Sequence, residues 1–340
     1  MTTRYLATRD DWSEALASAG EPKFRAGQVW EGLYAQRRPL EDISNVGRAR
    51  REQLAEQFPL ALSEQRRLEG DDGTTVKWLW AAADGRQIET VLMRYPDRAT
   101  VCVSSQAGCA MACSFCATGQ AGFERHLDAG EIVEQVLRAQ HATEQRVANV
   151  VFMGMGEPLA NLDAVWTATE RLHGDVGLSA RHITISTVGL VPGMRQLADL
   201  PLPVTLAVSL HAPDDELRNE LVPVNKRYPI AAVIDAAREY VARKGRRVTF
   251  EYACIEHVND QILRAEALAA LLRGFPGGAH VNLIPLNATA GYGGAPTARA
   301  RLESFAGALV DRGVNATIRR NRGTDIDAAC GQLRARFPEG

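Results

Sequence analysis

The spacing of apolar residues along the 340-residue chain changes twice, and each change predicts a different kind of structure. Between residues 10 and 58, apolar side chains recur every three or four positions, as in "VWEGLY" (29–34), which predicts short helices. From about residue 60 to residue 95, apolar and polar residues alternate in runs joined at Asp84-Gly85, which predicts a β-hairpin. After residue 98, short apolar runs alternate with helical patterns.

Six apolar runs after residue 98 have the length and composition of strands, and amphipathic segments separate them. This alternation predicts parallel β/α units, in which the carboxyl ends of the strands meet at one edge of the sheet and gather ligand groups there. We therefore predict an α/β protein with three regions: a small helical domain over 1–58, a β-hairpin region over 59–97 and the β/α units over 98–340.

Composition indicates a large globular fold but does not identify a binding partner. Apolar residues make up 46% of the chain, which is enough for one large core and a smaller second domain. The 39 basic and 41 acidic residues nearly cancel, so total charge gives no argument for nucleic acid. Local basic clusters could still hold RNA phosphates on one face, although most such runs are solvated surface. The clusters are Arg37-Arg38, Arg48 with Arg50-Arg51, Arg243-Lys244 with Arg246-Arg247, and Arg319-Arg320 with Arg322.

The N-terminal sequence has acidic residues where a signal peptide needs an apolar stretch, and no window has the roughly twenty apolar residues of a membrane span. We therefore expect a cytoplasmic protein without a membrane partner. A reducing cytosol disfavours structural disulfides, so the six cysteines are candidates for metal binding or catalysis.

The strongest motif is a cysteine cluster directly after the first strand of the β/α units. Cys109, Cys113 and Cys116 have C-x3-C-x2-C spacing, and small residues between them let the thiolates converge. A structural zinc ion requires a fourth ligand, and none lies at suitable spacing. A [4Fe–4S] cluster with three protein ligands leaves one iron open to a small molecule that reacts there. We favour the iron–sulfur cluster; a zinc site in a non-catalytic RNA-binding protein is the alternative.

Polar residues follow several of the other predicted strands. Gly156 and Glu157 in "GMGEP" follow the second strand, and further candidates follow the third, fourth and sixth strands: Ser186, Ser209 with His211, and Asn287. Singly, each could be a satisfied polar cap. Together they form a ring of hydrogen-bonding groups at one edge of the sheet, as a ribose and an aminoacyl tail would require.

Three cysteines lie outside the cluster motif. Cys330 in "TDIDAACGQL" stands between acidic residues and a glycine, which indicates a loop, and a loop thiol in a cytosolic enzyme is a candidate nucleophile. The commoner role of a free cysteine is that of a small buried hydrophobe, which we assign to Cys254 in the apolar "FEYACIE". Cys102 lies seven residues before the cluster motif and does not share its spacing.

From about residue 20 onward, several stretches resemble one family, the RlmN/Cfr radical-SAM ribosomal RNA adenine methyltransferases. They are "FRAGQVWEGLY", "IETVLMR", "CVSSQAGCAMACSFCATGQAGF", "FMGMGEPLANL", "ISTVGLVPG", "VSLHAPDDELRNELVPVNKRYPI", "YACIEHVND", "VNLIPLN" and "RGTDIDAACGQL". The resemblance implies that residues 98–340 form a partial (β/α)6 radical-SAM barrel with a C-terminal catalytic cysteine loop. It also implies that the helical domain helps to dock structured RNA.

Within the family, Pro158, Ala212, Pro285 and Arg322-Gly323 fit the RlmN branch better than the Cfr branch. The RlmN branch methylates carbon 2 of adenine 2503 in 23S rRNA and, in some bacteria, carbon 2 of adenine 37 in transfer RNAs, whereas the Cfr branch methylates carbon 8. Because no single position decides the regiochemistry, C8 methylation stays as an alternative, as does another radical-SAM reaction on the same scaffold.

The resemblance implies a radical route that uses two molecules of S-adenosylmethionine (SAM) per turnover. Carbon 2 of adenine is electron-poor and does not attack an electrophilic methyl group directly. By this resemblance, Cys330 takes a methyl group from one SAM. A 5′-deoxyadenosyl radical from a second SAM, bound at the cluster of Cys109, Cys113 and Cys116, removes a hydrogen from that methyl. The methylene radical then adds to adenine and joins protein and RNA through Cys330.

The same resemblance assigns the groups that release the product. Glu89 removes the proton from the substituted carbon, and Cys102 attacks the Cys330 sulfur, which forms a disulfide and frees the methylated RNA. The implied partners are 23S rRNA, transfer RNA in part of the family, and an electron donor such as flavodoxin. We expect a monomer. The SAM contacts implied by the resemblance are Gly156, Glu157, Ser186, Ser209, Leu210, His211 and Asn287.

Overall fold

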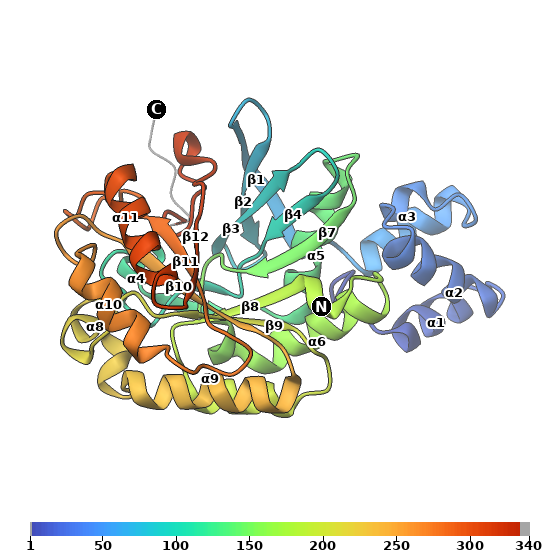
Figure 1. The fold of residues 1–340 in the computed structure, drawn as a ribbon. Helices are drawn as coiled ribbons and strands as arrows, with labels where there is room; N and C mark the ends of the chain where they lie inside the picture. Colours follow the sequence, from blue (N-terminus) through green and yellow to red (C-terminus); the bar gives the residue numbers. More distant parts are fainter. Residues whose placement is uncertain (1, 334–340) are drawn as a thin grey trace.

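The computed structural model describes residues 2–333, and a ten-stranded sheet runs through its main body (Figure 1). The strand order is β1-β2-β3-β4-β7-β8-β9-β10-β11-β12. Neighbouring strands pair antiparallel from β1 to β4 and parallel from β4 to β12. The parallel strands are β4 (Ala99–Cys102), β7 (Val147–Phe152), β8 (Ile183–Thr187), β9 (Thr205–Ser209), β10 (Val248–Cys254), β11 (His280–Pro285) and β12 (Asn315–Ile318).

The predicted β/α units are confirmed, and one strand was missed. All six apolar runs form parallel strands, whereas β12 was not predicted. The sequence "NATI" of β12 carries little apolar signal because this edge strand is half exposed. The fold is therefore α/β, with a sheet that is dominated by parallel strands.

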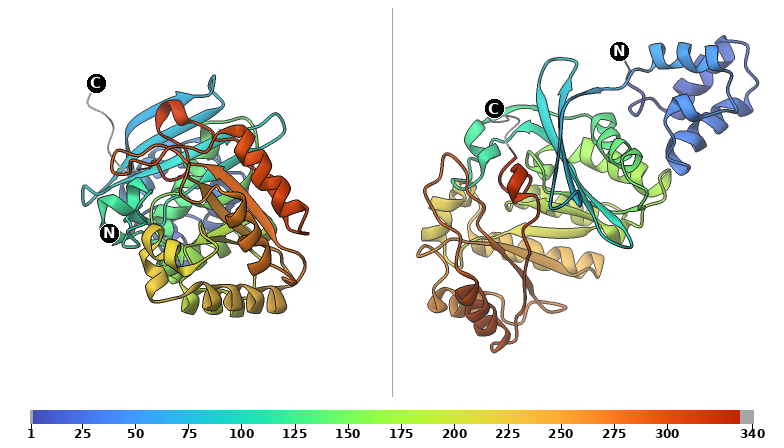
Figure 2. Two further views of the ribbon diagram at one scale, coloured as in Figure 1. Left: turned by 60° about the vertical axis from the view of Figure 1, so that its left-hand side comes forward. Right: turned by 90° about the horizontal axis from the view of Figure 1, so that it is seen from above.

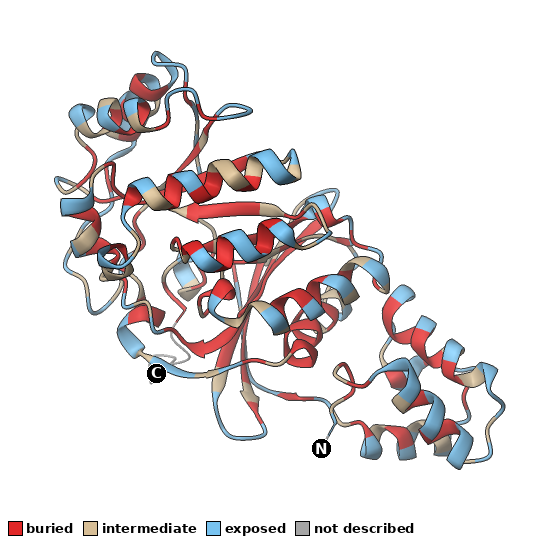
Figure 3. Ribbon diagram, turned by 90° about the horizontal axis from the view of Figure 1, so that it is seen from below, coloured by how far each residue is buried: buried red, intermediate tan, exposed pale blue. Residues whose placement is uncertain are grey.

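Helices between the parallel strands pack along the outer face of the sheet, with buried sides inward and exposed sides outward (Figure 3). Their amphipathic patterns explain this placement, because apolar residues at helical spacing need a partner surface. None of the helices in residues 2–333 has the length and apolar character to span a bilayer. The main helices are α5 (Ala129–His141), α6 (Leu162–Gly174), α7 (Val191–Asp199), α8 (Asp215–Leu221), α9 (Ile230–Lys244), α10 (Ile262–Leu271) and α11 (Arg299–Val310).

The N-terminal helices form a small unit at one side of the main body (Figures 1 and 2). They are α1 (Arg9–Ser18), α2 (Phe24–Trp30), which continues as a π-helical turn (Glu31–Ala35), and α3 (Arg48–Gln57), in agreement with the predicted helical pattern. Trp12 packs against Phe58 with ring centroids 4.5 Å apart, so the unit has apolar contacts of its own. The Arg37 guanidinium donates to the carbonyl of Val176 at 3.0 Å and ties the unit to the body.

The antiparallel part of the sheet has three strands where two were predicted. The predicted hairpin corresponds to β2 (Thr75–Ala82) and β3 (Gln87–Arg94). The additional strand β1 (Leu62–Gly70) is exposed over most of its length, so its sequence "LSEQRRLEG" lacks the apolar alternation that identifies a strand. We call β1 to β3 the β-extension; it lies beside β4, where the parallel sheet begins.

Candidate active site

The cysteine loop (residues 109–116) is held between two short strands. β5 (Gln106–Gly108) precedes it and pairs antiparallel with β6 (Phe123–His126), which follows the short helix α4 (Ala117–Ala121). The Cys109 amide donates to the Gly122 carbonyl at 2.7 Å and closes the loop. Ala112 has φ of 53°, a left-handed conformation that non-glycine residues rarely adopt and that tends to occur at functional sites.

All three thiols of this loop line one cavity of about 160 Å³, which we call the rim cavity because strand ends surround it. Burial raises the pKa of the Cys109 thiol to about 12 and that of Cys113 well above its usual value; the neighbouring thiols add to both shifts. Metal ligation requires the thiolate form, so binding would release protons here.

The donor set of the rim cavity suits an iron–sulfur cluster. Within residues 2–333, no three Cys, His, Asp or Glu side chains converge closely enough to hold a single metal ion. A [4Fe–4S] cubane instead presents an iron at each of several corners, so three thiolates can reach it from separate sides. Cys109, Cys113 and Cys116 would be its ligands and leave one iron open toward the remaining space of the cavity.

The turn after β7 supplies two of the predicted cofactor residues, Gly156 and Glu157, and both line the rim cavity. Gly156 has φ of 102°, and a Cβ atom there would lie 2.6 Å from the Cβ of Gln106, so the position requires glycine. The Glu157 carboxylate accepts hydrogen bonds from the amides of Leu159 and Val188 at 3.1 and 2.9 Å. Its burial raises its pKa to about 7.

Three more predicted residues, Ser186, Ser209 and His211, line the same cavity from the ends of β8 and β9. Ser186 Oγ donates to the Phe152 carbonyl, which ties β8 to β7. His211 Nδ1 accepts the Ala253 amide at 2.9 Å, and burial lowers the pKa of this imidazole to about 3, so it is neutral near pH 7. The backbone of neighbouring strands therefore holds the Ser186 and His211 side chains in place.

Two predicted cofactor residues differ from the others in placement. Leu210 is fully buried in the apolar core and does not line the rim cavity, so its contact with SAM stays a prediction. Asn287 lines the cavity, and its side-chain amide donates to the Cys330 carbonyl at 2.9 Å, so it also holds the segment that carries Cys330.

A buried arginine that sequence reasoning missed holds these strand ends together. Arg218 on α8 is 0% exposed, and its guanidinium donates to Asn225 Oδ1 and to the backbone carbonyls of Val188, Ser209 and Leu210. Burial lowers its pKa to about 10, so it stays charged at neutral pH. A charged residue inside the stretch "DELRNELVP" looks like an ordinary helix surface, so the sequence gives no signal for this role.

An Arg218→Met variant is expected to lose about 3–5 kcal/mol of unfolding free energy, because several buried carbonyls lose a charged donor at once. Urea unfolding followed by circular dichroism measures the change. Arg195→Met is the control, since Arg195 forms an exposed ion pair with Glu239, and it should change little. Equal stability of the two variants would contradict the structural role of Arg218.

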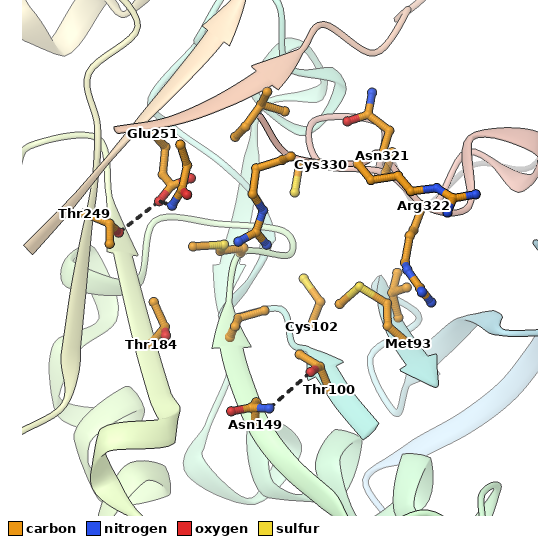
Figure 4. A pocket seen from close by; sticks show the side chains of 18 of the residues that line it. Met93, Thr100, Cys102, Asn149, Thr184, Thr249, Glu251, Asn321, Arg322 and Cys330 are labelled. Carbon is orange, nitrogen blue, oxygen red and sulfur yellow. Dashed lines mark hydrogen bonds between the residues drawn. The ribbon is translucent and has the colours of Figure 1, made fainter. Parts of the chain in front are cut away.

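A second cavity, of about 360 Å³, adjoins the first; we call it the inner cavity (Figure 4). Met153, Glu251, Ile284 and Cys330 line both cavities. In Figure 4 the sulfur atoms of Cys102 and Cys330 point into the same space from opposite sides. Both thiols are free, and each residue lines this cavity. The structure thus brings together two cysteines more than two hundred residues apart in sequence.

The two cysteines differ in environment. Cys102 lies at the end of β4 and is 7% exposed, and burial raises the pKa of its thiol strongly, with a further rise from the nearby Cys330. Cys330 is an exposed residue of its loop. Its sulfur nevertheless points into the inner cavity, where desolvation raises the pKa of the thiol and the Arg319 guanidinium lowers it. Cys254 is fully buried, as predicted for a core residue.

Polar side chains line part of the inner cavity, since a Thr or Asn from each of six successive strands faces it: Thr100, Asn149, Thr184, Thr205, Thr249 and Asn282. Glu251 stands among them, 5% exposed, and accepts hydrogen bonds from Asn282 and Thr249 at 2.8 and 2.9 Å. Sequence reasoning missed this set. The signal was present, since a glutamate inside the apolar run "VTFEYAC" needs partners when it is buried.

Five arginines also line the inner cavity: Arg98, Arg181, Arg319, Arg320 and Arg322. Of the four predicted basic clusters, the one at 319–322 therefore lies at this cavity. Arg37 is instead bonded to backbone at the junction with the main body, and Arg243 pairs with Asp199. A cavity lined by positive charge next to two thiols can receive a base whose phosphates stay outside.

Glu89, the predicted base, lies on β3 beside this region. It is 0% exposed, whereas an isolated glutamate in a strand is usually at the surface. Its neighbour two residues on, Val91, lines the inner cavity and pairs in register with Cys102. Because side chains two apart in a strand share a face, Glu89 faces the same side as these residues.

The Cys330 loop (residues 321–333) is attached to both sides of the site. Toward the cysteine loop, the Gly331 carbonyl accepts the Ala117 amide at 2.8 Å. Toward the β-extension, the Gly323 amide donates to Asp71 Oδ2 at 2.7 Å. Cys330 thus stands between the two cavities on a loop that distant parts of the chain hold in place.

Comparison with known proteins gives consistent matches. A sequence profile described as Radical SAM superfamily matches residues 103–268. A protein of Frankia alni named probable dual-specificity RNA methyltransferase RlmN is 51% identical over 98% of this chain and 83% of its own length. A protein of Corynebacterium diphtheriae with the same name is 50% identical over 96% of this chain and 91% of its own. The crystal structure of a radical SAM methyltransferase from Sphaerobacter thermophilus is 48% identical, has a TM-score of 0.92, and covers 99% of this chain and 100% of its own.

Proposed function

The chain belongs to the RlmN family of radical SAM RNA methyltransferases, and from that membership we propose that it methylates carbon 2 of adenine 2503 in 23S rRNA, with adenine 37 of transfer RNAs as a second substrate. One observation carries the proposal. Cys102 and Cys330 face the inner cavity, and this cavity adjoins the rim cavity of Cys109, Cys113 and Cys116. The thiols that we propose as methyl carrier and resolving nucleophile would therefore lie beside the proposed cofactor site.

Radical SAM enzymes use a [4Fe–4S] cluster and SAM. In the proposed site, Cys109, Cys113 and Cys116 hold the cluster, and Gly156, Glu157, Ser186, Ser209, His211 and Asn287 surround SAM in the rim cavity. When bound, the two cofactors supply a 5′-deoxyadenosyl radical. Two SAM molecules are used per turnover, one for the methyl group of Cys330 and one for the radical.

The chain's own residues then carry the methyl carbon to the RNA. Cys330 takes the methyl group on its sulfur and, after loss of a hydrogen atom, bonds through that carbon to C2 of adenine. The unpaired electron of this adduct must then pass to a one-electron acceptor. Glu89 accepts the proton from C2. Cys102 attacks the Cys330 sulfur, so a disulfide forms and the sulfur–carbon bond breaks. The electron pair of that bond goes to the CH2 carbon, which takes up a proton to become the methyl group, and the methylated RNA leaves. An electron donor such as flavodoxin supplies the electron for reductive cleavage of SAM, and a thiol reductant must supply two electrons and two protons to reduce the disulfide before the next turnover.

In this proposal, RNA binds at the arginine-lined inner cavity. The five arginines of the inner cavity would contact phosphates around a flipped adenine, and the helical domain over 1–58 would contact more distant parts of the RNA. We propose a monomer that acts in the cytoplasm, and a division of the chain into the helical domain, the β-hairpin region over 59–97 and the catalytic domain over 98–340. Residues 334–340 lie outside the described part of the chain.

The proposed function is tested by incubating the reconstituted enzyme with 23S rRNA, labelled SAM and a reductant, followed by nucleoside analysis. We expect labelled 2-methyladenosine. Labelled 8-methyladenosine would instead support the Cfr-like alternative. Mass spectrometry of rRNA from a strain without this gene provides the second test, since persistence of 2-methyladenosine at the target would contradict the proposal.

Anaerobic reconstitution with iron and sulfide is expected to give a brown protein with about four irons per chain, because the three cysteine thiolates are the ligands that the protein supplies to a [4Fe–4S] cluster. Visible absorbance and iron analysis measure this outcome. The matched control replaces Cys109, Cys113 and Cys116 together by Ala and should stay colourless. A colourless parent protein that binds one zinc ion would favour the non-catalytic RNA-binding alternative.

A further inference from the structure

A buried ion pair joins the second and third strands of the β-extension. Lys77 on β2 and Glu89 on β3 are 2% and 0% exposed, and Lys77 Nζ lies 3.5 Å from Glu89 Oε1. Burying two charges costs desolvation free energy, and apolar side chains of similar volume usually stabilise a fold at least as well. Stability therefore does not explain why a lysine and a glutamate stand at these positions, and another reason is needed.

The same ammonium group also contacts the Cys330 loop. Lys77 Nζ donates a hydrogen bond to the Asp327 carbonyl at 3.1 Å, three residues before Cys330. Asp327 has φ of 51°, so the backbone there takes a left-handed conformation that needs support from its surroundings. Asp71 at the end of β1 supports the loop further, because its carboxylate accepts the Gly323 amide at 2.7 Å. Lys77 is thus in contact with both the proposed base and the segment that carries the methyl group.

Glu89 and Lys77 lie on the face of the β-extension that meets the Cys330 loop. Glu89 is opposite Leu79, and Lys77 is opposite Val91, so all four side chains share this face. Helix α5 covers the other face, where Gln135 accepts a hydrogen bond from Thr90 Oγ1. On the Glu89 side, Lys77 pairs with Glu89, and Cys102 is opposite Val91 in the sheet. The ionisable groups of the loop lie at known contacts: Asp327 at Lys77, Asp325 at the Asp71 amide, Arg322 at the Arg94 carbonyl, and Cys330 at the inner cavity. Glu131 and Glu134 lie on α5, against the other face.

We propose that Lys77 is a positioning residue that keeps Glu89 ionised and aligned with the Cys330 loop while the protein and RNA are joined. A buried carboxyl group by itself favours the protonated form, and a nearby ammonium favours the carboxylate. Only the carboxylate can accept a proton from C2 of adenine; the C–H bond breaks, its proton goes to a Glu89 oxygen and its electron pair stays in the ring. The inference rests on the proposed function, in which Glu89 is the base.

The experiment compares the parent enzyme with Lys77→Met and Lys77→Arg variants in single turnover with 23S rRNA and SAM across a range of pH. Intact-protein mass spectrometry measures methyl-Cys330, a denaturing gel measures the protein–RNA adduct, and nucleoside analysis measures 2-methyladenosine. For Lys77→Met we expect normal methyl-Cys330, accumulated adduct and product release slowed by about 10²–10⁴-fold at neutral pH, with partial recovery as the pH rises. Lys77→Arg keeps the charge and should recover most of the rate.

A matched control separates positioning from general destabilisation. Arg138→Met breaks the pair of Arg138 with the buried Glu134 on the other face of the same strands. It should lower the thermal stability without accumulating adduct. The inference is overturned if Lys77→Met releases product at the parental rate with an unchanged pH profile, or if methyl-Cys330 and adduct are lost together, as a folding defect predicts. If the parent enzyme itself forms neither species, the proposed function has failed, and the inference with it.

Discussion

A Cys330→Ala variant is expected to lose RNA methylation by at least about 10³-fold while it keeps its iron, because the variant lacks the sulfur that we propose as the carrier of the methyl carbon. Cys102 is a poor substitute, since it is buried and burial raises the pKa of its thiol strongly. Nucleoside analysis measures the methylation, and visible absorbance measures the cluster. Cys254→Ala is the matched control, since Cys254 is a fully buried core cysteine outside both cavities.

Two outcomes of this experiment would contradict the assignment. Retained methylation in Cys330→Ala would exclude Cys330 as the methyl carrier and would favour a different radical SAM reaction on the same scaffold. Loss of iron together with methylation would mean that Cys330 supports the cluster instead. The Cys330 loop could support the cluster in this way because the Gly331 carbonyl accepts a hydrogen bond from the Ala117 amide, in the helix that follows the cysteine loop.

A Cys102→Ala variant is expected to form the bond between Cys330 and adenine but to fail at product release, so that protein and RNA stay covalently joined. Cys330 can take the methyl group and bond to adenine, but no second thiol lines the inner cavity to attack its sulfur. We expect less than one product per enzyme and a stable adduct that a denaturing gel resolves and ribonuclease shortens. Cys254→Ala again serves as the control. Release of free methylated RNA at the parental rate would require the resolving role of Cys102 to be withdrawn.

The β/α architecture could be predicted from sequence because each central strand is an apolar run bounded by helical patterns. The edge strands β1 and β12 could not be predicted in the same way. Both lie at the edges of the sheet and are largely or partly exposed, so selection for buried apolar residues is weak there. A prediction that depends on hydrophobic periodicity finds the centre of a sheet more readily than its borders.

The candidate site could be predicted from the sequence where its residues form a local motif or follow successive parallel strands. Cys109, Cys113 and Cys116 form a local motif, and the polar strand ends lie where parallel topology puts them. The approach of Cys102 to Cys330 and of Lys77 to Glu89 depends on the tertiary fold. Glu89 was assigned by resemblance alone, and nothing in its strand distinguishes it from a surface residue; burial beside a lysine gives it a physical context that the sequence lacked.

The attachment of the Cys330 loop has a consequence for how the enzyme is made. Every other predicted site residue precedes Cys330 in the chain, and the loop bonds back to Asp71 and Ala117, which are synthesised long before it. Contacts of such high sequence separation form late, because closing a long loop costs chain entropy first. A chain that ends before residue 330 would therefore contain the three cysteines proposed to bind the cluster but lack the cysteine proposed to carry the methyl group.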